Sequence, residues 1–329
     1  MPARILSTRF CKACTLALLF FLLMLPHSQA QTRFKTLNYL YQVSGRNTLS
    51  GQHNREPNAE PCMWTDSIRV TTGKYPALWS GDFLFQQENI EHRRTMIKEA
   101  ERQWKAGSLV QIMLHTCPPV SEPCEWQGGV LSKLPDDEWN AIFVDGSRMN
   151  RLWKARLDTI GRYLLYLREK NVEVLFRPHH EMNQGVFWWG GRKGPEGTAK
   201  LFRFTHDYLT DSLGLDNLIW VWDVQDLSRD IAEYNPGSEY WDVFAFDVYD
   251  KGYDKEWYDY LLPIVGNKPM AIGECAKLPS VEMLAEQPRW VFFMSWAELV
   301  YKENSRNEIS RLYNSDRIIT RDEMGDWKK

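Results

Sequence analysis

The sequence lacks a strong excess of charge of either sign. It carries 40 lysine and arginine residues against 43 aspartate and glutamate residues, which gives a formal net charge of −3 at pH 7. Proteins that bind nucleic acid or anionic lipid through electrostatics usually carry a clear basic excess. We therefore expect neither a nucleic-acid partner nor a membrane partner for this chain.

Long apolar runs are also missing. The apolar run Leu16–Leu25 has only about half the residues that a membrane-spanning helix needs. Basic residues precede this run and the small-residue sequence Ser28-Gln29-Ala30 follows it, which is the pattern of a secretory signal peptide. We expect residues 1–30 to be removed by cleavage near Ala30 and Gln31, and the mature chain to be secreted or periplasmic.

Zinc-binding cysteine spacing is absent from the mature chain. None of the four cysteines after residue 30 belongs to a C-x-x-C pair, so a structural zinc site is not expected. Export permits disulfide bonds. Cys117 and Cys124 bracket the short sequence PPVSEP, whose ends could easily meet, and we expect this pair to form a disulfide. Cys62 remains a competing partner.

Internal repeats, low-complexity segments and linkers are absent, so we expect residues 31–329 to form one domain. Short apolar runs alternate with longer amphipathic stretches along this part of the chain. Near-continuous apolar runs are typical of parallel strands that helices cover on the outside. The candidate strands are residues 47–52, 75–83, 108–116, 172–180, 217–223, 241–249, 268–274 and 290–296.

Apolar residues with helical spacing lie between these runs, within residues 88–105, 152–167 and 202–209. Gly107 and Gly214 follow the first and the third stretch as helix ends. Strand–helix alternation repeated eight times in about 300 residues predicts an α/β fold, the (β/α)8 TIM barrel. A doubly wound open sheet is the alternative, but its usual glycine-rich phosphate loop is not found after the first candidate strand.

Functional side chains of a (β/α)8 barrel stand at the carboxyl ends of its strands. One end of this barrel is therefore predicted to be a functional cleft. For Asp223 and Asp247 a structural role is favoured, and strand alternation points His179 away from His180. The ionisable and aromatic residues at the strand ends are Asp82, His115, His180, Glu181, Asp223, Asp247, Tyr249, Glu274 and Trp296.

Glu181 and Glu274 are the candidate catalytic pair. They close the fourth and the seventh strand, and so should face each other across the mouth of the barrel. Two opposed carboxyl groups suit the hydrolysis of a glycosidic bond, in which one group protonates the leaving oxygen while the other attacks the sugar or activates water. The chain also has 15 tryptophans and 14 tyrosines, whose flat faces suit stacking against sugar rings.

The sequence FRPHHEMNQGVFWWGG resembles the signature after the fourth strand of glycoside hydrolase family 26, in which R-P-x-H-E is followed by F-W-W-G. KPMAIGE resembles the nucleophile strand of that family, and FDVYD and FFMSW resemble its sixth and eighth strand ends. SGQHN and LWSGDF also fit, so the resemblance covers most of the mature chain. The family is a retaining (β/α)8 group dominated by β-1,4-mannanases, and it also holds β-1,3:1,4-glucanases and β-1,3-xylanases.

The resemblance implies a role for each matching residue. Glu181 would be the general acid/base and Glu274 the nucleophile. Tyr249 would hydrogen-bond Glu274. The substrate-binding residues, with Trp296 as the floor of the −1 subsite, would be His115, His180, Tyr249, Trp296, Trp188, Trp189, Arg177 and Asp82. Arg177 could instead be a buried charge satisfied by carboxylates, Asp82 could cap a loop, and at least one residue of the tryptophan pair is expected to be structural.

Two positions depart from the family pattern. Val186 stands where several family members place a tryptophan that forms a platform in the +1 subsite. The third strand ends in LHTCPP, where a tryptophan-histidine pair is frequent. The first departure leaves the balance of endo and exo cutting open.

The expected function is endo-hydrolysis of β-1,4-mannan, glucomannan or galactomannan by a monomer that needs no cofactor. The alternatives within the family are an exo-acting mannobiohydrolase, a β-1,3:1,4-glucanase and a β-1,3-xylanase. A non-catalytic carbohydrate-binding barrel is the alternative of another class, and it would be expected to have lost Glu181, Glu274 or Tyr249. A zinc hydrolase is disfavoured, because HHEMN lacks the H-E-x-x-H spacing.

Overall fold

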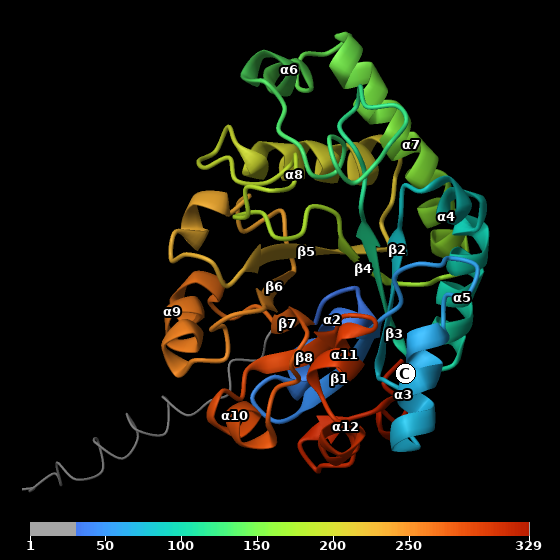
Figure 1. Ribbon diagram of the computed structural model, residues 1–329, viewed down its shortest axis with the longest axis vertical. Helices are drawn as coiled ribbons and strands as arrows, with labels where there is room; N and C mark the ends of the chain where they lie inside the picture. The colour runs from blue at the N-terminus through green and yellow to red at the C-terminus, as the bar shows by residue number, and fades with distance from the viewer. Residues whose placement is uncertain (1–30, 329) are drawn as a thin grey trace, which may run out of the picture. The chain divides into compact units, whose positions relative to one another are not determined.

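The computed structural model describes residues 31–328, and the predicted signal peptide lies outside them. Eight parallel strands form the centre of this part of the chain (Figure 1). Because β1 pairs with both β2 and β8, the sheet closes into a barrel, which confirms the predicted (β/α)8 fold. The strands are β1 (Thr48–His53), β2 (Leu78–Phe83), β3 (Leu109–Leu114), β4 (Val174–Arg177), β5 (Leu218–Gln225), β6 (Val243–Val248), β7 (Met270–Cys275) and β8 (Trp290–Ser295).

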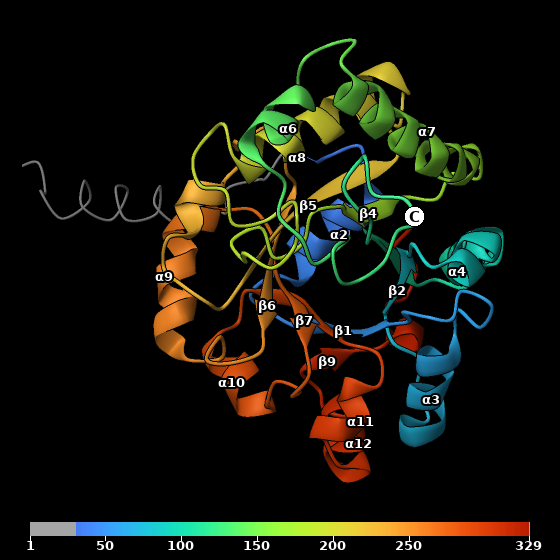
Figure 2. The same cartoon turned by 45° about the horizontal axis from the view of Figure 1, so that its top comes forward.

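Helices surround the strands on the outside of the barrel (Figure 2). Short 3-10 turns occur at Ile231–Tyr234 and Arg321–Glu323. None of the helices in residues 31–328 is long and apolar enough to span a membrane. The helices are α2 (Lys35–Val43), α3 (Met63–Thr72), α4 (Gln87–Glu91), α5 (Arg93–Lys105), α6 (Asp136–Ala141), α7 (Arg148–Glu169), α8 (Thr198–Asp207), α9 (Lys255–Val265), α10 (Val281–Glu286), α11 (Leu299–Glu303) and α12 (Arg306–Tyr313).

Two of the expected helices differ from the structure in detail. The stretch 88–105 is split into α4 and α5 at His92, whose ψ of 7° leaves the helical range. The third stretch continues from α8 into a π-helical turn, Tyr208–Ser212. Gly214 follows this turn with a φ of +67°, the left-handed conformation that glycine adopts without strain.

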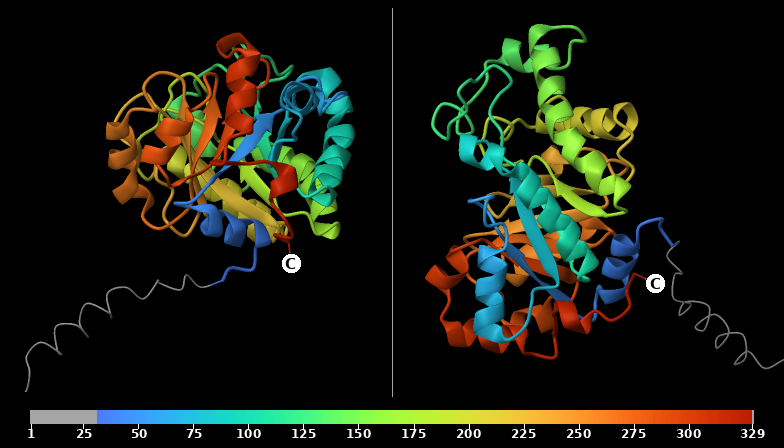
Figure 3. Two further views of the ribbon diagram at one scale, coloured as in Figure 1. Left: turned by 90° about the horizontal axis from the view of Figure 1, so that it is seen from below. Right: turned by 90° about the vertical axis from the view of Figure 1, so that its right-hand side faces the viewer.

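The apolar residues form two cores. One core lies between the barrel and its outer helices, and it contains most of the tryptophans, including Trp220, Trp222 and Trp241. The other core lies inside the barrel and continues into α2, whose Leu37 and Leu40 pack beneath the strands. α2 lies at one end of the barrel (Figure 3), so that end is closed by apolar side chains.

A ninth strand, β9 (Ile318–Ile319), pairs in parallel with the first two residues of β1, Thr48 and Leu49, and has no counterpart among the candidate strands. It has only two residues, which is too short for an alternation pattern to reveal. The segment after it packs against the closed end of the barrel, where Trp327 stacks on Tyr39 and donates from its indole nitrogen to Gly107 O at 2.9 Å.

Candidate active site

Strand alternation decides which side chains enter the mouth of the barrel. Leu175 in β4 belongs to the core inside the barrel, whereas its neighbour Phe176 belongs to the outer core. Because successive side chains point to opposite faces of a strand, a residue two positions after an interior residue is interior as well. The residues that this rule places above the interior core are His115, Arg177, Asp223, Asp247 and Trp296.

Glu274 reaches the interior by a different route. Ala271 is interior, so simple alternation would place Gly273 inside and Glu274 outside. The register of β6 and β7 shifts at this point, and Asp247 pairs with Glu274 instead. A bulge of this kind redirects a side chain, and it turns Glu274 toward the site.

Gly273 makes room for the carboxylates next to it. A Cβ atom at this position would lie 2.5 Å from Asp247 Oδ1 and 2.7 Å from Asp223 Oδ2. Such short contacts with buried carboxylates would force the strands apart. Glycine is therefore required by the close approach of these groups.

Arg177 connects the carboxylates of neighbouring strands. Its Nη1 atom donates to Asp223 Oδ2 at 2.5 Å and to Asp247 Oδ1 at 2.9 Å. Its Nη2 atom donates to Glu274 Oε1. Since the arginine side chain has no exposed surface, it cannot contact a sugar, and the substrate-binding expectation is corrected to a buried charge that orients Glu274.

The two candidate catalytic carboxyl groups lie close together. One oxygen atom from each of Glu181, Asp247 and Glu274 lies within 4.8 Å of the others. Retaining glycosidases place their two carboxyl groups about 5–5.5 Å apart, whereas inverting enzymes leave about 6.5–9.5 Å for a water molecule. The separation of Glu181 and Glu274 therefore fits the retaining arrangement.

Glu181 has an unusual backbone conformation. Its φ of +50° lies in the left-handed region, which typically costs about 1–3 kcal/mol for a residue other than glycine. A hydrogen bond stabilises this conformation, because the Glu181 amide donates to Asp223 Oδ1 at 2.7 Å. Its carboxylate accepts a hydrogen bond from Gln184 Nε2, which also donates to Gln225 Oε1 at 2.7 Å.

The surroundings of the two glutamates separate their pKa values. Burial, together with the charges of Glu274 and Asp223, raises the pKa of Glu181 well above its usual range. Burial also raises the pKa of Glu274, but Arg177 and the Tyr249 hydroxyl, which donates to Glu274 Oε2 at 2.6 Å, work in the opposite direction. Glu181 is thus suited to hold a proton while Glu274 is ionised.

Two histidines and an aspartate form a second group of polar side chains at the strand ends. His115 Nδ1 donates to Asp82 Oδ2 at 2.6 Å, and the rings of His115 and His180 lie 4.5 Å apart. Asp82 is fully buried, so it orients His115 and cannot bind substrate directly, which corrects that expectation. Burial and the neighbouring His115 lower the pKa of His180 well below its usual value, which keeps this ring neutral.

Trp296 lies at the end of β8 as expected, and its ring stacks on His53 with 4.2 Å between the centroids. Trp296 is partly exposed, so part of its surface is accessible to solvent. Burial lowers the pKa of His53 to about 3, so a neutral ring supports the tryptophan.

The tryptophan pair after Glu181 is structural. Trp188 and Trp189 have almost no exposed surface. Trp188 Nε1 donates to Thr116 O at 2.7 Å, and Trp189 Nε1 donates to His180 O at 2.9 Å. The expectation of sugar contact is therefore corrected for both residues, which fix the loops around the site. Phe187, stacked on Trp189 at 4.6 Å, is the partly exposed ring at this place.

Carboxylate oxygens of Glu181, Asp247 and Glu274 are close enough to one another to hold a cation. Arg177 already donates to two of these residues and supplies positive charge there. The histidines of the zinc alternative do not converge, because His179 points outward and its Nε2 contacts the Thr205 hydroxyl at 3.0 Å. The geometry favours an acid/base and nucleophile pair over a metal centre.

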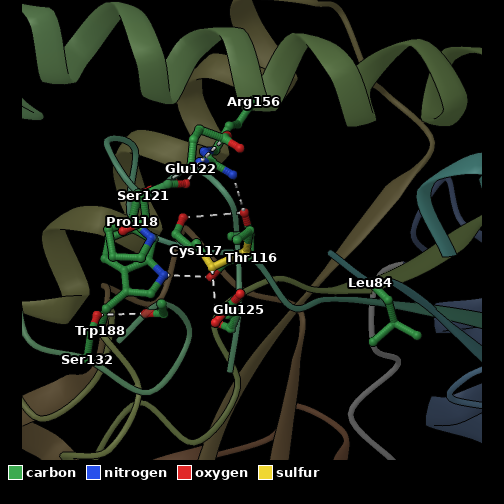
Figure 4. The surroundings of a disulfide bond; sticks show 12 residues. Leu84, Thr116, Cys117, Pro118, Ser121, Glu122, Glu125, Ser132, Arg156 and Trp188 are labelled. Atoms are coloured by element: carbon green, nitrogen blue, oxygen red, sulfur yellow. Dashed lines mark hydrogen bonds and ion pairs between the residues drawn. A yellow bond between two sulfur atoms is a disulfide. The ribbon is translucent and has the colours of Figure 1, made fainter. Parts of the chain in front are cut away.

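The loop after β3 contains the disulfide Cys117–Cys124, in the pairing expected from the sequence (Figure 4). Cys62 is a free thiol and donates to Glu99 Oε1 at 2.6 Å, so it is not the competing partner. Arg156 of α7 holds the same loop through the Pro118 and Ser121 carbonyls, at 3.2 and 3.0 Å.

Three supporting residues were not singled out from the sequence. His53 ends β1 in the quoted segment SGQHN, and its strand-end position was a usable signal. Asp226 accepts hydrogen bonds from the amides of Tyr249, Asp250 and Gly252, and so fixes the loop that carries Tyr249. The contact of Gln184 with Glu181 depends on a loop conformation for which the sequence gives no signal.

Comparison with known proteins identifies relatives along nearly the whole chain. The sequence profile of glycosyl hydrolase family 26 matches residues 25–323. A mannan endo-1,4-beta-mannosidase of Thermothelomyces thermophilus is 30% identical over 318 residues, which is 92% of this chain and 63% of that protein. A protein of the same name from Bacillus subtilis is 30% identical over 307 residues, which is 82% of this chain and 80% of its own length.

Solved structures of family members also have a similar fold. The GH26A protein of Muricauda sp. MAR_2010_75 superposes with a TM-score of 0.83 at 32% identity, covering 91% of this chain and 99% of that one. A Podospora anserina GH26-CBM35 beta-(1,4)-mannanase gives a TM-score of 0.75 at 30% identity, with 90% and 67% covered.

Proposed function

The chain belongs to glycoside hydrolase family 26, and from this premise we propose that it is a retaining endo-β-1,4-mannanase that cuts mannan, glucomannan or galactomannan. The observation that carries the retaining mechanism is the closeness of Glu181 and Glu274, whose oxygen atoms come within 4.8 Å. The choice of mannan is supported by the names of the relatives from T. thermophilus and B. subtilis.

In the first step, Glu181 protonates the glycosidic oxygen while Glu274 attacks the anomeric carbon. The raised pKa of Glu181 keeps its proton available at neutral pH. Arg177 and Tyr249 each donate to a different oxygen of Glu274, which holds the carboxylate in line for attack. The product of this step is a covalent glycosyl-enzyme and a free leaving chain.

In the second step, water takes the place of the leaving chain and Glu181 accepts its proton. The water oxygen attacks the anomeric carbon, and the bond to Glu274 breaks. Once Glu274 is esterified, its negative charge no longer raises the pKa of Glu181, so Glu181 ionises more readily. The same residue can therefore serve as the acid first and as the base afterwards.

Sugar binding in the −1 subsite is assigned to Trp296, His180 and His115. Trp296 is partly exposed. His180 directly precedes Glu181 in the chain, and the ring of His115 lies 4.5 Å from the ring of His180. Tyr249 is 39% exposed although its hydroxyl is bound to Glu274, so its ring also borders the substrate.

The leaving-group side distinguishes endo from exo cutting. Val186 is 50% exposed in the loop that follows Glu181, and an aliphatic side chain provides less stacking surface than an aromatic one. The aromatic contact that is replaced is worth about 0.5–1.5 kcal/mol. Weak binding on this side would shift the products toward short oligosaccharides without changing the reaction.

The test is product analysis on linear β-1,4-mannan, mixed-linkage β-glucan and β-1,3-xylan at early time points. A spread of manno-oligosaccharides with retained anomeric configuration supports the proposal. Mannobiose alone would indicate an exo enzyme, and products from glucan or xylan alone would overturn the substrate. Sugar binding without any product would favour the non-catalytic alternative.

We also propose that the protein is exported and acts as a monomer. A polymeric mannan cannot enter a cell, so its hydrolysis must take place outside the cytoplasm, and the sequence of residues 1–30 supports this localisation. The monomer is supported by the site itself, since each of the residues assigned above lies in the one compact unit Phe34–Lys329.

A further inference from the structure

A cavity of about 370 Å³ lies on the outer side of β3. Its walls come from α4, α5, α7, the end of β3 and the disulfide loop. Leu114 and Thr116 line it, whereas His115 between them faces the active site, so the strand end separates the two spaces. The volume falls in the range of about 300–1,000 Å³ that small-molecule sites occupy.

Arg93, at the start of α5, is an unbalanced charge in this cavity. It is only 8% exposed, and its Nη2 atom donates to a neutral acceptor, Leu84 O, at 2.5 Å. Its Nε atom is buried without a hydrogen-bond partner, and within residues 31–328 Arg93 takes part in no ion pair. A buried guanidinium usually has a carboxylate partner, as Arg177 has.

Arg156 brings a second positive charge to the cavity wall. Its neutral acceptors are two loop carbonyls and the Thr116 hydroxyl. Its one acidic contact in the described chain, Glu122 at 2.9 Å, has a side chain that is 75% exposed (Figure 4). Burial lowers the pKa of Arg93 to about 10; Tyr163 and Asp82 partly oppose this decrease, and the charge of Arg156 adds to it. Two cations thus line this cavity, and its one acidic lining residue, Glu122, already pairs with Arg156, so Arg93 is left without a carboxylate partner there.

A further unpaired donor lies on the same wall. Trp153 lines the cavity, is fully buried, and its indole N–H has no hydrogen-bond partner. Buried donors are nearly always paired, and leaving one unpaired typically costs about 1–3 kcal/mol. The two arginines and the tryptophan that line this cavity favour a ligand that accepts hydrogen bonds and carries negative charge.

The remaining wall is apolar. Leu157 and Ile160 of α7, with Ile90 of α4, contribute aliphatic surface next to the charged end. An inorganic anion would leave this surface without contacts, whereas an organic acid would cover it.

We propose that this cavity binds a small organic monocarboxylate with an apolar body. The carboxylate accepts hydrogen bonds from Arg93 and Arg156, which suits the fork geometry of guanidinium groups. The apolar body packs against Leu157 and Ile160. This site is separate from Glu181 and Glu274 and does not depend on the proposed mannanase activity.

The test is titration of the purified protein with benzoate at constant ionic strength, followed by calorimetry and by the midpoint of thermal unfolding. Saturable binding that raises the midpoint is expected. Benzamide, the neutral isostere, should bind at least tenfold more weakly. Equal binding of the two compounds, or no saturable binding of benzoate, would overturn the proposal.

Variants locate the site. Arg93→Met should weaken benzoate binding at least tenfold, whereas Arg94→Met, which removes an exposed arginine from the same helix, should leave it unchanged. If the first variant does not fold, Trp153→Phe provides a second test and should weaken binding several-fold. Unchanged affinity in the folded Arg93 or Trp153 variant contradicts the location, and tighter binding of inorganic phosphate than of benzoate contradicts the ligand class.

Discussion

Glu181 and Glu274 differ in the donors that face them. Glu274 accepts hydrogen bonds from a guanidinium and from a phenol, whereas Glu181 accepts one from the neutral amide of Gln184. A donor stabilises the ionised form of a carboxyl group, and a cationic donor does so most strongly. Two residues of the same type thereby receive different tasks from their surroundings alone.

Substrates with different leaving groups distinguish an acid role of Glu181 from a nucleophile role of Glu274. Glu274→Ala should abolish turnover of every substrate, because the covalent step is lost. Glu181→Ala should slow hydrolysis of mannan by about 10²–10⁴-fold, but should retain the first turnover of an activated aryl β-mannoside, whose leaving group needs no proton. A burst measurement of aryl release from both variants checks this, and equal loss on both substrates in the Glu181 variant would contradict its acid role.

The Tyr249 hydroxyl should set the acid limb of the pH profile. Its hydrogen bond lowers the pKa of Glu274, so Tyr249→Phe should raise that pKa and move the acid limb of kcat/KM to higher pH. The lost bond to a charged acceptor is worth about 1.5–3 kcal/mol, which corresponds to a decrease in kcat of about ten- to a hundredfold. Initial rates across pH for both proteins provide the measurement.

Tyr253→Phe is the matched control, since its hydroxyl donates to Lys277 O at 2.6 Å and does not contact Glu274. This variant should leave the acid limb where it is. An unmoved limb in Tyr249→Phe would mean that the phenol does not tune the nucleophile. The alkaline limb, at which Glu181 loses its proton, should move less than the acid limb.

Residue type and position predicted which polar and aromatic side chains gather at the strand ends, but they did not predict how exposed each side chain is. Asp82, Arg177, Trp188 and Trp189 stand where the sequence places them, yet they are buried and support their neighbours. A strand-end position tells which way a side chain points, while the depth at which it lies depends on loops that pack over it. The left-handed backbone of Glu181 likewise has no sequence signal, because glutamate rarely adopts it.

Among the elements, β7 determines whether Glu274, the proposed nucleophile, reaches the site. The period-two pattern of MAIGE would send Glu274 outward, and the shifted register against β6 reverses this. The strands and the main helices could be predicted because apolar periodicity reports burial. The bulge in β7 and the two-residue β9 could not, because each depends on pairing with a strand distant in the sequence, and the break at His92 left no pattern in the apolar spacing.

Gly273→Ala tests the crowding behind this bulge. The added methyl group would lie within 2.7 Å of both Asp223 and Asp247 oxygens, so the free energy of unfolding should fall by about 1–3 kcal/mol or more. Displacement of the carboxylates should also reduce kcat. Denaturant unfolding and initial rates measure the two effects.

Gly185→Ala is the matched change for stability, because a Cβ atom there would have no neighbour within 4 Å. Its free energy of unfolding should stay within about 0.5 kcal/mol of the parent protein. Equal destabilisation by both substitutions would show that close approach at Gly273 is not the cause.

At the scale of the whole molecule, the disulfide makes the stability of the fold depend on whether its surroundings are oxidising or reducing. Cys117 and Cys124 are separated by seven positions, and closing a loop of this length stabilises a fold by about 2–3 kcal/mol in the chain-entropy account. The double variant Cys117→Ser, Cys124→Ser should lose that amount, as measured by denaturant unfolding without reductant. Cys62→Ser, which alters a free thiol, should lose less, and a disulfide variant as stable as the parent would contradict the expectation.

The apolar closure of the barrel by α2 has a consequence for what the protein can synthesise. Because Leu37 and Leu40 close one end of the barrel, water can approach the glycosyl-enzyme only from the open mouth, where a departing chain has just left. A second oligosaccharide arriving there competes with water for the same intermediate. If the protein is the mannanase proposed above, the ratio of newly joined to hydrolysed chains should therefore rise with acceptor concentration, so that the site that shortens a polymer also lengthens an acceptor.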